Sequence, residues 1–98
     1  TIHYKYIQRK EVIETMKCVR VSKDSTPAQV AGAIAGILRE DGEVLVQAMG
    51  AAAVNQMAKA TAVARRFMRD EGSDLSLQPR LETSDDLTRV IFEVKKID

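Results

Sequence analysis

A strand that passes through a single glycine into a long alanine-rich helix is the feature that most constrains this fold. Residues 44–46 form a short β-branched and aliphatic run typical of a strand, and the alanine-rich segment downstream has the low side-chain entropy cost that favours helix. Gly50 joins them, where a glycine permits positive φ and close approach of the backbone. The joint exposes the first helical N–H groups, with Asn55, Gln56 and Lys59 within a turn or two of them.

Length and charge indicate one small domain without a strong overall electrostatic field. A chain of 98 residues can hold one hydrophobic core without disulfides or metal. Fifteen Lys and Arg residues against fourteen Asp and Glu residues give a formal net charge of +1. Any attraction for nucleic acid or an anionic membrane must therefore come from a local basic surface.

The chain offers little for catalysis, metal binding or membrane insertion. Cys18 is the only cysteine and His3 the only histidine, with no convincing nucleophile and base pair and no metal-ligand spacing. No apolar run approaches the roughly 20 residues that span a bilayer, and residues 1–6 lack the apolar centre of a signal peptide. We therefore expect a cytoplasmic, non-enzymatic protein with no cofactor, no metal and no membrane contact.

Residues 1–15 are the least readable segment. Basic residues such as Arg9 stand beside Tyr4 and Tyr6, a mixture that could neutralise phosphates and stack on bases. The favoured interpretation is a frayed N-terminal arm or an extra edge strand, because both tyrosines fall on one side of an extended chain. The domain itself is expected to comprise residues 16–98.

The domain opens with a predicted strand over residues 16–22. Val19 and Val21 fall on one face of this strand, and Met16 and Cys18 fall on the other. A small apolar residue in a strand usually serves packing, so we expect Cys18 to be buried.

A helix is predicted over residues 27–40. Thr26 can cap it, Pro27 suits the first helical position, and Gln29 can reach back to complete a capping box. Gly42 suits the left-handed residue that commonly ends a helix.

Gly32 and Gly36 give this first helix a smooth strip, with Ala28 and Ala35 nearby. The missing side chains allow another backbone to come close. We favour the sheet or the second helix of the same chain over a partner subunit as the neighbour, because helix glycines usually have local packing reasons. The core stripe of the helix is expected to be Val30, Ile34, Ile37 and Leu38.

Residues 43–49 predict a short central strand, and residues 51–69 predict an amphipathic helix. The side expected to be buried carries Ala53, Met57, Ala60, Ala64, Phe67 and Met68. The opposite side carries Asn55, Lys59, Arg66 and Arg69.

The polar side of this second helix has two interpretations. In the first, four basic residues follow a phosphate backbone and two amides bond a base, a phosphate or a small anion. In the second, the side is an ordinary solvated face, because basic residues near a helix C-terminus are favoured by the macrodipole without any ligand. Charge alone favours the second interpretation. The residues concerned are Lys59, Arg65, Arg66 and Arg69, with Asn55 and Gln56.

Residues 74–83 and 88–97 predict a β-hairpin with a turn rich in aspartate. Leu75 and Leu77 are expected to point inward. Pro79 indicates an edge strand or a bulge, since proline cannot donate to a β-ladder.

The predicted fold class is therefore α+β, in the order β-α-β-α-β-β, with two helices packed against one mixed four-stranded sheet. Right-handed crossovers put both helices on one face. The other face would be solvated or covered by a partner, so we expect self-association; the apolar residues expected to point that way are Met16, Cys18, Leu45 and Met49. Residues 70–86 hold six acids and one basic residue, an asymmetry that could orient a second copy.

A dense series of residues also matches a known family in order. The series comprises Val21-Ser22, Pro27, the run from Val30 to Gly36, Glu43, Gln47-Ala48, Gly50-Ala51, Asn55-Gln56, Lys59-Ala60, Ala64-Arg65 and the run from Gly72 to Leu75. Over about residues 16–97 the chain thereby resembles the stage V sporulation protein S family. The resemblance implies an Alba-like two-layer fold and a nucleic-acid-binding regulator connected with sporulation or development, frequently an oligomer.

The chain departs from the family pattern at three points. Ala52 stands where the family usually has glycine, which adds a methyl group at the helix start and could narrow an anion site there. The hairpin at residues 83–88 looks shorter than usual, which weakens the analogy with Alba proteins that use a long hairpin arm. The arm at residues 1–15 looks additional.

Two main functional hypotheses follow. The first is a nucleic-acid-binding homo-oligomer that contacts DNA or RNA through Lys23, Asn55, Gln56, Lys59, Arg65, Arg66 and Arg69. The second is a protein-interaction or structural oligomerisation module without nucleic-acid binding. A small-anion or nucleotide sensor at Gly50 is a weaker third, because the chain has no Walker-type lysine motif and no dinucleotide glycine signature.

Overall fold

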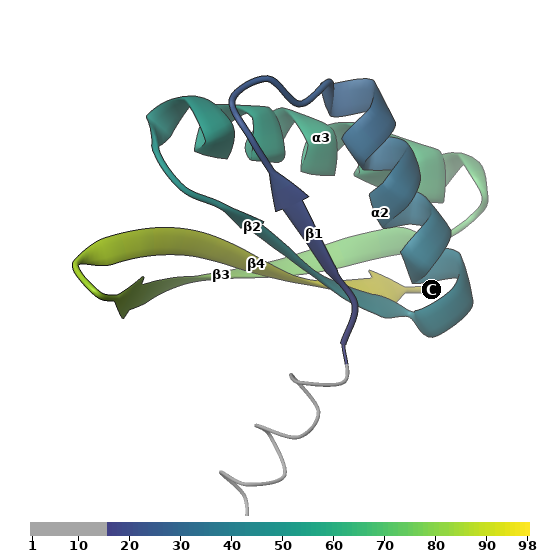
Figure 1. Cartoon of the computed structure of the whole chain (residues 1–98). Helices are drawn as coiled ribbons and strands as arrows, with labels where there is room; N and C mark the ends of the chain where they lie inside the picture. The colour runs from purple at the N-terminus through teal and green to yellow at the C-terminus, as the bar shows by residue number, and fades with distance from the viewer. Residues whose placement is uncertain (1–15) are drawn as a thin grey trace, which may run out of the picture.

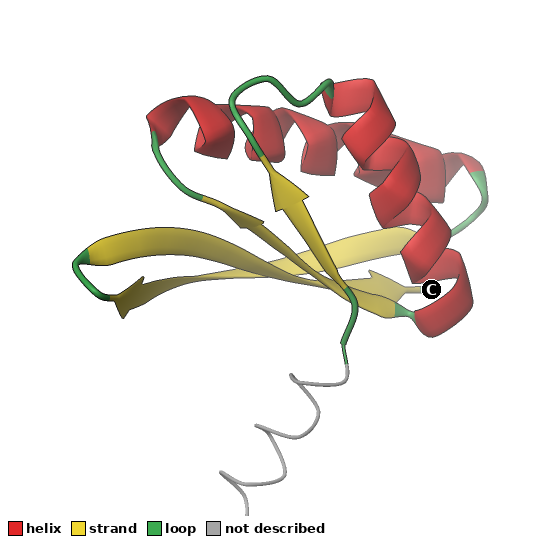
Figure 2. Cartoon of the chain, viewed as in Figure 1, coloured by secondary structure: helices red, strands yellow, loops and turns green. Residues whose placement is uncertain are grey.

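The computed structural model describes residues 16–98, so the arm predicted for residues 1–15 lies outside the described residues. Within them the elements are β1 (Cys18–Val21), α2 (Pro27–Asp41), β2 (Glu43–Ala48), α3 (Ala51–Asp70), β3 (Asp74–Ser84) and β4 (Leu87–Ile97). Both helices lie on the same side of the sheet (Figures 1 and 2). The predicted two-layer α+β fold is confirmed.

The strand order explains why the helices share one side. The sheet runs β1-β2-β4-β3, with β1 parallel to β2 and with β2 and β3 each antiparallel to β4. The chain crosses from β1 to β2 through α2 and then onward to β3 through α3, moving in the same direction across the sheet. Two right-handed crossovers in one direction bring both helices to one face.

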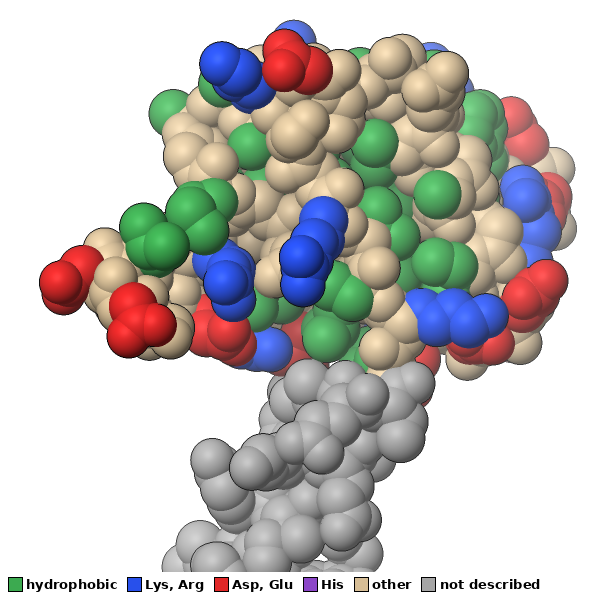
Figure 3. All heavy atoms as spheres, viewed as in Figure 1, with side chains coloured by type: hydrophobic (Ala, Val, Ile, Leu, Met, Phe, Trp, Pro, Cys, Tyr) green, Lys and Arg blue, Asp and Glu red, His purple; other side chains and the backbone are tan. Residues whose placement is uncertain are grey.

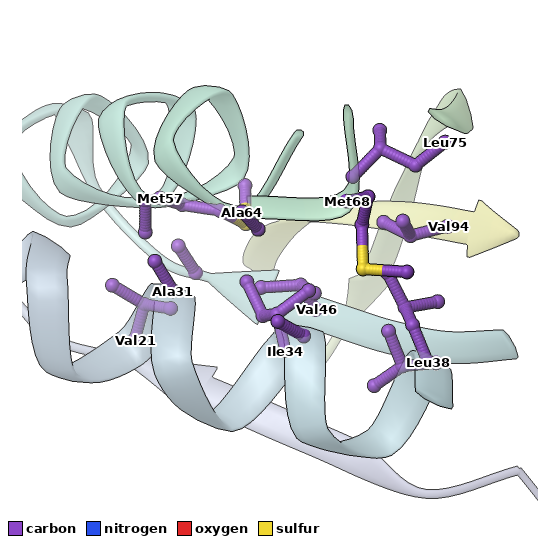
Figure 4. Close-up of a cluster of buried hydrophobic side chains, with 14 of the residues drawn as sticks. Val21, Ala31, Ile34, Leu38, Val46, Met57, Ala64, Met68, Leu75 and Val94 are labelled. Atoms are coloured by element: carbon purple, nitrogen blue, oxygen red, sulfur yellow. The ribbon is translucent and has the colours of Figure 1, made fainter. Parts of the chain in front are cut away.

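The core lies between the two helices and the sheet (Figure 4). The face of α3 predicted to be buried is confirmed apart from Phe67, which is only partly covered. Ala60 and Ala64 are fully buried, and their small side chains let the backbone of α3 lie close to its neighbours. The largest fully buried side chains are Ile34, Leu38, Val44, Val46, Met57, Met68 and Val94.

The start of α2 differs from the predicted capping box. Thr26 occupies the N-cap position with extended backbone, and Pro27 follows in the first turn, but no side chain caps the helix. The serines before it order the loop instead. Ser22 N–H donates to Ser25 Oγ at 2.8 Å, and Ser25 N–H donates to Ser22 O at 3.1 Å. The capping-box prediction is therefore wrong, because a serine turn holds the approach to the helix.

Two glycines end and begin helices as predicted. Gly42 has φ of 78°, and its N–H donates to Leu38 O at 2.9 Å, which closes α2 with a left-handed residue. Gly50 has φ of 88° and ψ of 154°, a backbone conformation open almost only to glycine. The strand-to-helix joint therefore depends on Gly50.

The smooth strip of α2 is not packed against the sheet, the second helix or any other described part of the chain. A Cβ atom added at Gly32 or at Gly36 would meet nothing within 4 Å. The prediction of a close contact within the chain is therefore wrong. The helix is rotated so that Ala31 and Ala35 are the small residues that enter the core, which leaves Gly32 exposed.

Cys18 is exposed, contrary to the prediction that it is buried. It lies on the edge strand β1 and alternates with Val19 and Val21, which belong to the helix-covered core. Cys18 consequently faces the other side of the sheet, where its Sγ atom accepts from Gln47 Nε2 at 3.2 Å. Alternation along β1 was predicted correctly, but Cys18 stays exposed because β1 is an edge strand.

The hairpin runs past the rest of the sheet (Figure 1). Its turn is formed by Asp85 and Asp86, with φ of 51° and 64°. Pairing of β4 with β2 begins only at Val90, so residues 87–89 and the turn project beyond β2. β3 is an edge strand, which suits its proline.

The helices cover only the first part of β3. Leu75 is buried, but Leu77 is 38% exposed and Leu81 is 71% exposed. Leu77 was expected to point inward. It lies instead at the rim of the core. An apolar strip remains on the helix side of the hairpin.

Two ion pairs flank the turn between α3 and β3. Arg39 at the end of α2 bonds both carboxylate oxygens of Glu71 at 2.7 to 3.1 Å. Arg65 bonds both oxygens of Asp74, at 2.7 Å from Nε and 3.1 Å from Nη2. These bidentate pairs join α3 to α2 on one side and to β3 on the other.

The first prediction concerns the core. Met57→Ala removes one of the largest fully buried side chains and should lower the free energy of unfolding by about 2–5 kcal/mol. Urea denaturation followed by circular dichroism measures the loss. Met49→Ala is the matched control, because Met49 is 43% exposed and should change stability by less than about 0.5 kcal/mol. Equal losses in the two variants would contradict the packing described.

The second prediction concerns acid stability. Hydrogen bonds from Arg65, and next from the backbone N–H of Leu75, lower the pKa of Asp74 from 3.8 to about 2. A carboxyl with a depressed pKa stabilises the fold above pH 3.8, and this stabilisation is lost as the pH falls toward 2. Asp74→Asn should therefore destabilise the protein at pH 7 and differ progressively less from the parent between pH 4 and pH 2.

Urea unfolding at several pH values measures this difference. Asp70→Asn is the control, because Asp70 makes no ion pair within residues 16–98. A difference for Asp74→Asn that stayed constant down to pH 2 would show that the pair with Arg65 does not stabilise the fold.

Candidate nucleic-acid interface

The outer ridge of α3, defined here as Asn55, Lys59, Arg66 and Arg69, faces away from the sheet. All four residues are exposed, as the sequence predicted. Burial of Met57, Ala60 and Ala64 on the opposite side of the helix turns these polar side chains outward. With a rise of about 1.5 Å per residue, Lys59 and Arg69 lie about 15 Å apart along the helix axis.

The cations of the outer ridge are not neutralised by the rest of the described chain. Within residues 16–98, no ion pair joins Lys59, Arg66 or Arg69 to an acid. Arg66 and Arg69 border a shallow hollow of about 350 Å³ with Ala62, Arg65 and Asp70. The ridge therefore carries positive charge open to an external anion, with one carboxylate at its C-terminal end.

Arg65 lies on the flank of α3 and differs from its neighbours. Its guanidinium already bonds both oxygens of Asp74, and this pair lowers the pKa of that carboxyl to about 2. The structure thus separates Arg65 from the outer ridge, although the sequence suggested one continuous basic stripe.

Gln56 links the start of α3 to the loop before α2. Its Nε2 donates to Ser25 O at 3.0 Å, and the side chain is partly buried. Lys23 is exposed in the same loop. The bond therefore ties the loop that carries Lys23 to the first half of α3, while it occupies an amide donor that had been considered for a ligand.

The N-terminus of α3 is open. Gly50 is its N-cap, no side chain caps the helix, and Ala51 and Ala52 are exposed. The Val54 N–H already donates to Gly50 O at 3.0 Å. The methyl group of Ala52 points into solvent and blocks no contact within the described chain.

Three of the six acids of residues 70–86 form ion pairs within the described chain. Glu71 bonds Arg39, which lowers the pKa of Glu71, and Asp74 bonds Arg65. Glu82 accepts from both Arg80 and Arg89. The acidic surface expected to orient a partner is consequently weaker than the count of six acids suggests.

The sequence analysis did not identify two further cations, Arg20 on β1 and Arg89 on β4. Both line a small cleft at the end of the sheet. Figure 3 shows basic side chains over β1 and beside the hairpin, next to apolar surface. Each arginine alternates outward in its own strand, but only the order β1-β2-β4-β3 brings the strand ends together.

The described residues provide charge and hydrogen-bond donors. Within residues 16–98, no three His, Cys, Asp or Glu side chains gather so as to hold a metal ion. None of the helices in that part of the chain is long and apolar enough to cross a membrane. The chemistry available on the outer ridge is thus recognition of an anion by cations and amides.

The fold has a known counterpart. The chain is similar to the crystal structure of ALBA1 from Trypanosoma brucei, with a TM-score of 0.62 and 18% sequence identity. The alignment covers 84% of this chain and 71% of ALBA1. At this identity the likeness establishes the Alba-like fold.

The sequence itself matches a family over most of its length. Residues 17–95 match the family described as stage V sporulation protein S (SpoVS). The matched range includes both helices, all four strands up to Lys95, and the whole outer ridge of α3. The chain therefore belongs to the stage V sporulation protein S family.

Proposed function

We propose that this chain is a non-enzymatic, nucleic-acid-binding regulatory protein that acts as a homo-oligomer in sporulation or development. The outer ridge of α3 is the proposed contact surface for DNA or RNA. Family membership supports the link to sporulation. The observation that carries the binding proposal is the row of cations on one helix that form no ion pair within residues 16–98.

The spacing of these cations suits a phosphate backbone. Lys59 and Arg66 are separated by about 10 Å along the helix and Arg66 and Arg69 by about 5 Å. Phosphates along one strand of B-DNA follow each other at about 3.4 Å per base pair along the axis. Each cation can therefore meet a different phosphate, and Asn55 extends the ridge with polar contacts.

The remaining predicted site residues have supporting parts in this proposal. Lys23 adds a cation from the loop that Gln56 ties to α3. Arg65 acts chiefly as a positioning residue, because its bond to Asp74 fixes the C-terminal half of α3 against β3. The outer ridge, not the flank, supplies the principal phosphate contacts.

The third prediction tests this surface. Fluorescence anisotropy with a labelled DNA or RNA duplex should show that log K falls linearly with log salt, by about 0.9 per phosphate contact for B-DNA. Arg66→Glu removes a contact and adds a repulsion, so binding should weaken for every sequence and the salt slope should become shallower by about 1.

Lys95→Glu is the matched control. It makes the same change in charge at an exposed residue of β4, on the side of the sheet away from α3. Its affinity should stay close to that of the parent protein. Absence of binding by the parent at low salt, or equal weakening by both variants, would refute the outer ridge as the interface.

A second candidate function is a protein-interaction or structural oligomerisation module. A specific observation favours it, because nothing in the described chain comes within 4 Å of a Cβ added at Gly32 or Gly36. Glycines in a helix interior lower its stability by roughly 0.5–1 kcal/mol each relative to alanine. An external helix or strand seated against the strip would offset that cost.

The fourth prediction tests whether the glycine strip of α2 is an assembly surface. If α2 packs against a second copy, Gly36→Leu should disrupt the assembly and lower the mass measured by light scattering. Leucine favours helix more than glycine does, so the monomer should stay folded. Ala62→Leu, at an exposed position of α3, is the control and should leave the mass unchanged. An unchanged mass for Gly36→Leu would show that the glycine strip is not a contact in the assembly.

A further inference from the structure

A small cleft lies where β1 and β2 end and the hairpin leaves the sheet. Its volume is about 190 Å³, and it is lined by Arg20, Val21, Gln47, Ala48, Met49 and Arg89. Clefts for drug-sized ligands usually measure about 300–1,000 Å³, so this one suits a single small group. It is separate from the outer ridge of α3, with which it shares no residue.

The register of the strands brings the polar side chains of the cleft to one side. Arg20 pairs with Gln47 across β1 and β2, and Gln47 pairs with Ile91 across β2 and β4. Arg89 precedes Ile91 by two residues and therefore points to the same face. This face is opposite Val19 and Val46, which pack toward the helices.

The two arginines differ in how much of their charge is available. Arg20 is exposed and makes no ion pair within residues 16–98. Arg89 is 3.4 Å from Glu82, a carboxylate that Arg80 also contacts at 3.3 Å. Arg80 also bonds Glu93, so Arg80 and Arg89 together face two carboxylates; Arg89 makes only the single contact at 3.4 Å, and its side chain is 40% exposed.

Another acid of this face, Glu93, is already engaged by Arg80. Glu93 is 7% exposed and accepts from Arg80 Nε at 3.1 Å. Gln47 Nε2 donates to the weak acceptor Cys18 Sγ at 3.2 Å. The Gln47 side chain also lines the cleft. The cleft therefore has two cations and an amide above apolar walls, with no carboxylate among its lining residues.

We propose that Arg20 and Arg89 form a phosphate-binding notch, which holds a backbone phosphate of a second segment of nucleic acid. The notch deepens the proposed function and rests on it. Guanidinium groups match the geometry of phosphate oxygens in bidentate hydrogen bonds, and neighbouring apolar surface strengthens such contacts. Because the notch and the outer ridge lie on different sides of the two-layer domain, one molecule offers two separate phosphate contacts.

The fifth prediction is tested first on the unaltered protein. Titration with inorganic pyrophosphate, followed by ¹⁵N-HSQC NMR, should shift the backbone amides of Arg20, Gln47 and Arg89. The amide of Lys95, on the same face of β4 about 20 Å from Arg89, should not shift. Shifts confined to α3, or no shifts, would overturn the notch.

The second experiment uses the double variant Arg20→Gln/Arg89→Gln and a duplex in fluorescence anisotropy. The salt slope should become shallower by about 1, which is about a 3.5-fold smaller fall in affinity between 50 and 200 mM salt. Lys95→Gln is the control and should keep the parent slope. NMR peak dispersion verifies that the double variant is folded, and the titration of the parent protein decides the matter if it is not.

The outcomes separate the notch from the proposed function. Duplex binding with an unchanged slope in the double variant would overturn the notch and leave the proposed function standing. Pyrophosphate shifts in a protein that binds no duplex would overturn the proposed function and the nucleic-acid source of the phosphate. Shifts together with a shallower slope support both.

Discussion

Burial of the alanine face of α3 is the constraint on which the rest of the structure depends. Ala60 and Ala64 have no exposed surface and Ala53 has 4%, so the helix backbone lies close to α2 and the sheet. Met57 and Met68 fill the space that remains. This burial fixes the rotation of the helix, and the rotation directs Lys59 and Arg66 into solvent. Packing and the proposed interface are thus two sides of one helix.

Ion pairs then divide the arginines into two groups. Arg39, Arg65 and Arg80 bond acids on neighbouring elements and hold the helices and the hairpin together. Arg66 and Arg69 on α3, like Arg20 on β1, make no ion pair within residues 16–98 and remain available to an external anion. A net charge of +1 conceals this division, because each structural arginine is matched by an acid, whereas Arg20, Arg66 and Arg69 have no such match within residues 16–98.

Predictions from the sequence were correct where a single residue fixes the backbone conformation. Gly42 and Gly50 end and begin helices as expected, because each takes a positive φ that other residues rarely adopt. Predictions that depend on which residues lie nearby in the folded chain were less successful. Cys18 is exposed because it lies on the edge strand β1, and Gly36 meets no neighbouring element of the described chain because α2 turns Ala31 and Ala35 to the core instead.

The sequence by itself determined the order of elements, the sheet covered on one side and the exposed outer ridge of α3. Periodicity and crossover handedness are local or general properties, so they need no coordinates. Only the tertiary structure decided which cations are free, because an ion pair depends on the positions of residues far apart in the chain. Arg65 bonds Asp74 across the turn after α3, and Arg20 and Arg89 line one cleft because of a strand order that no local pattern encodes.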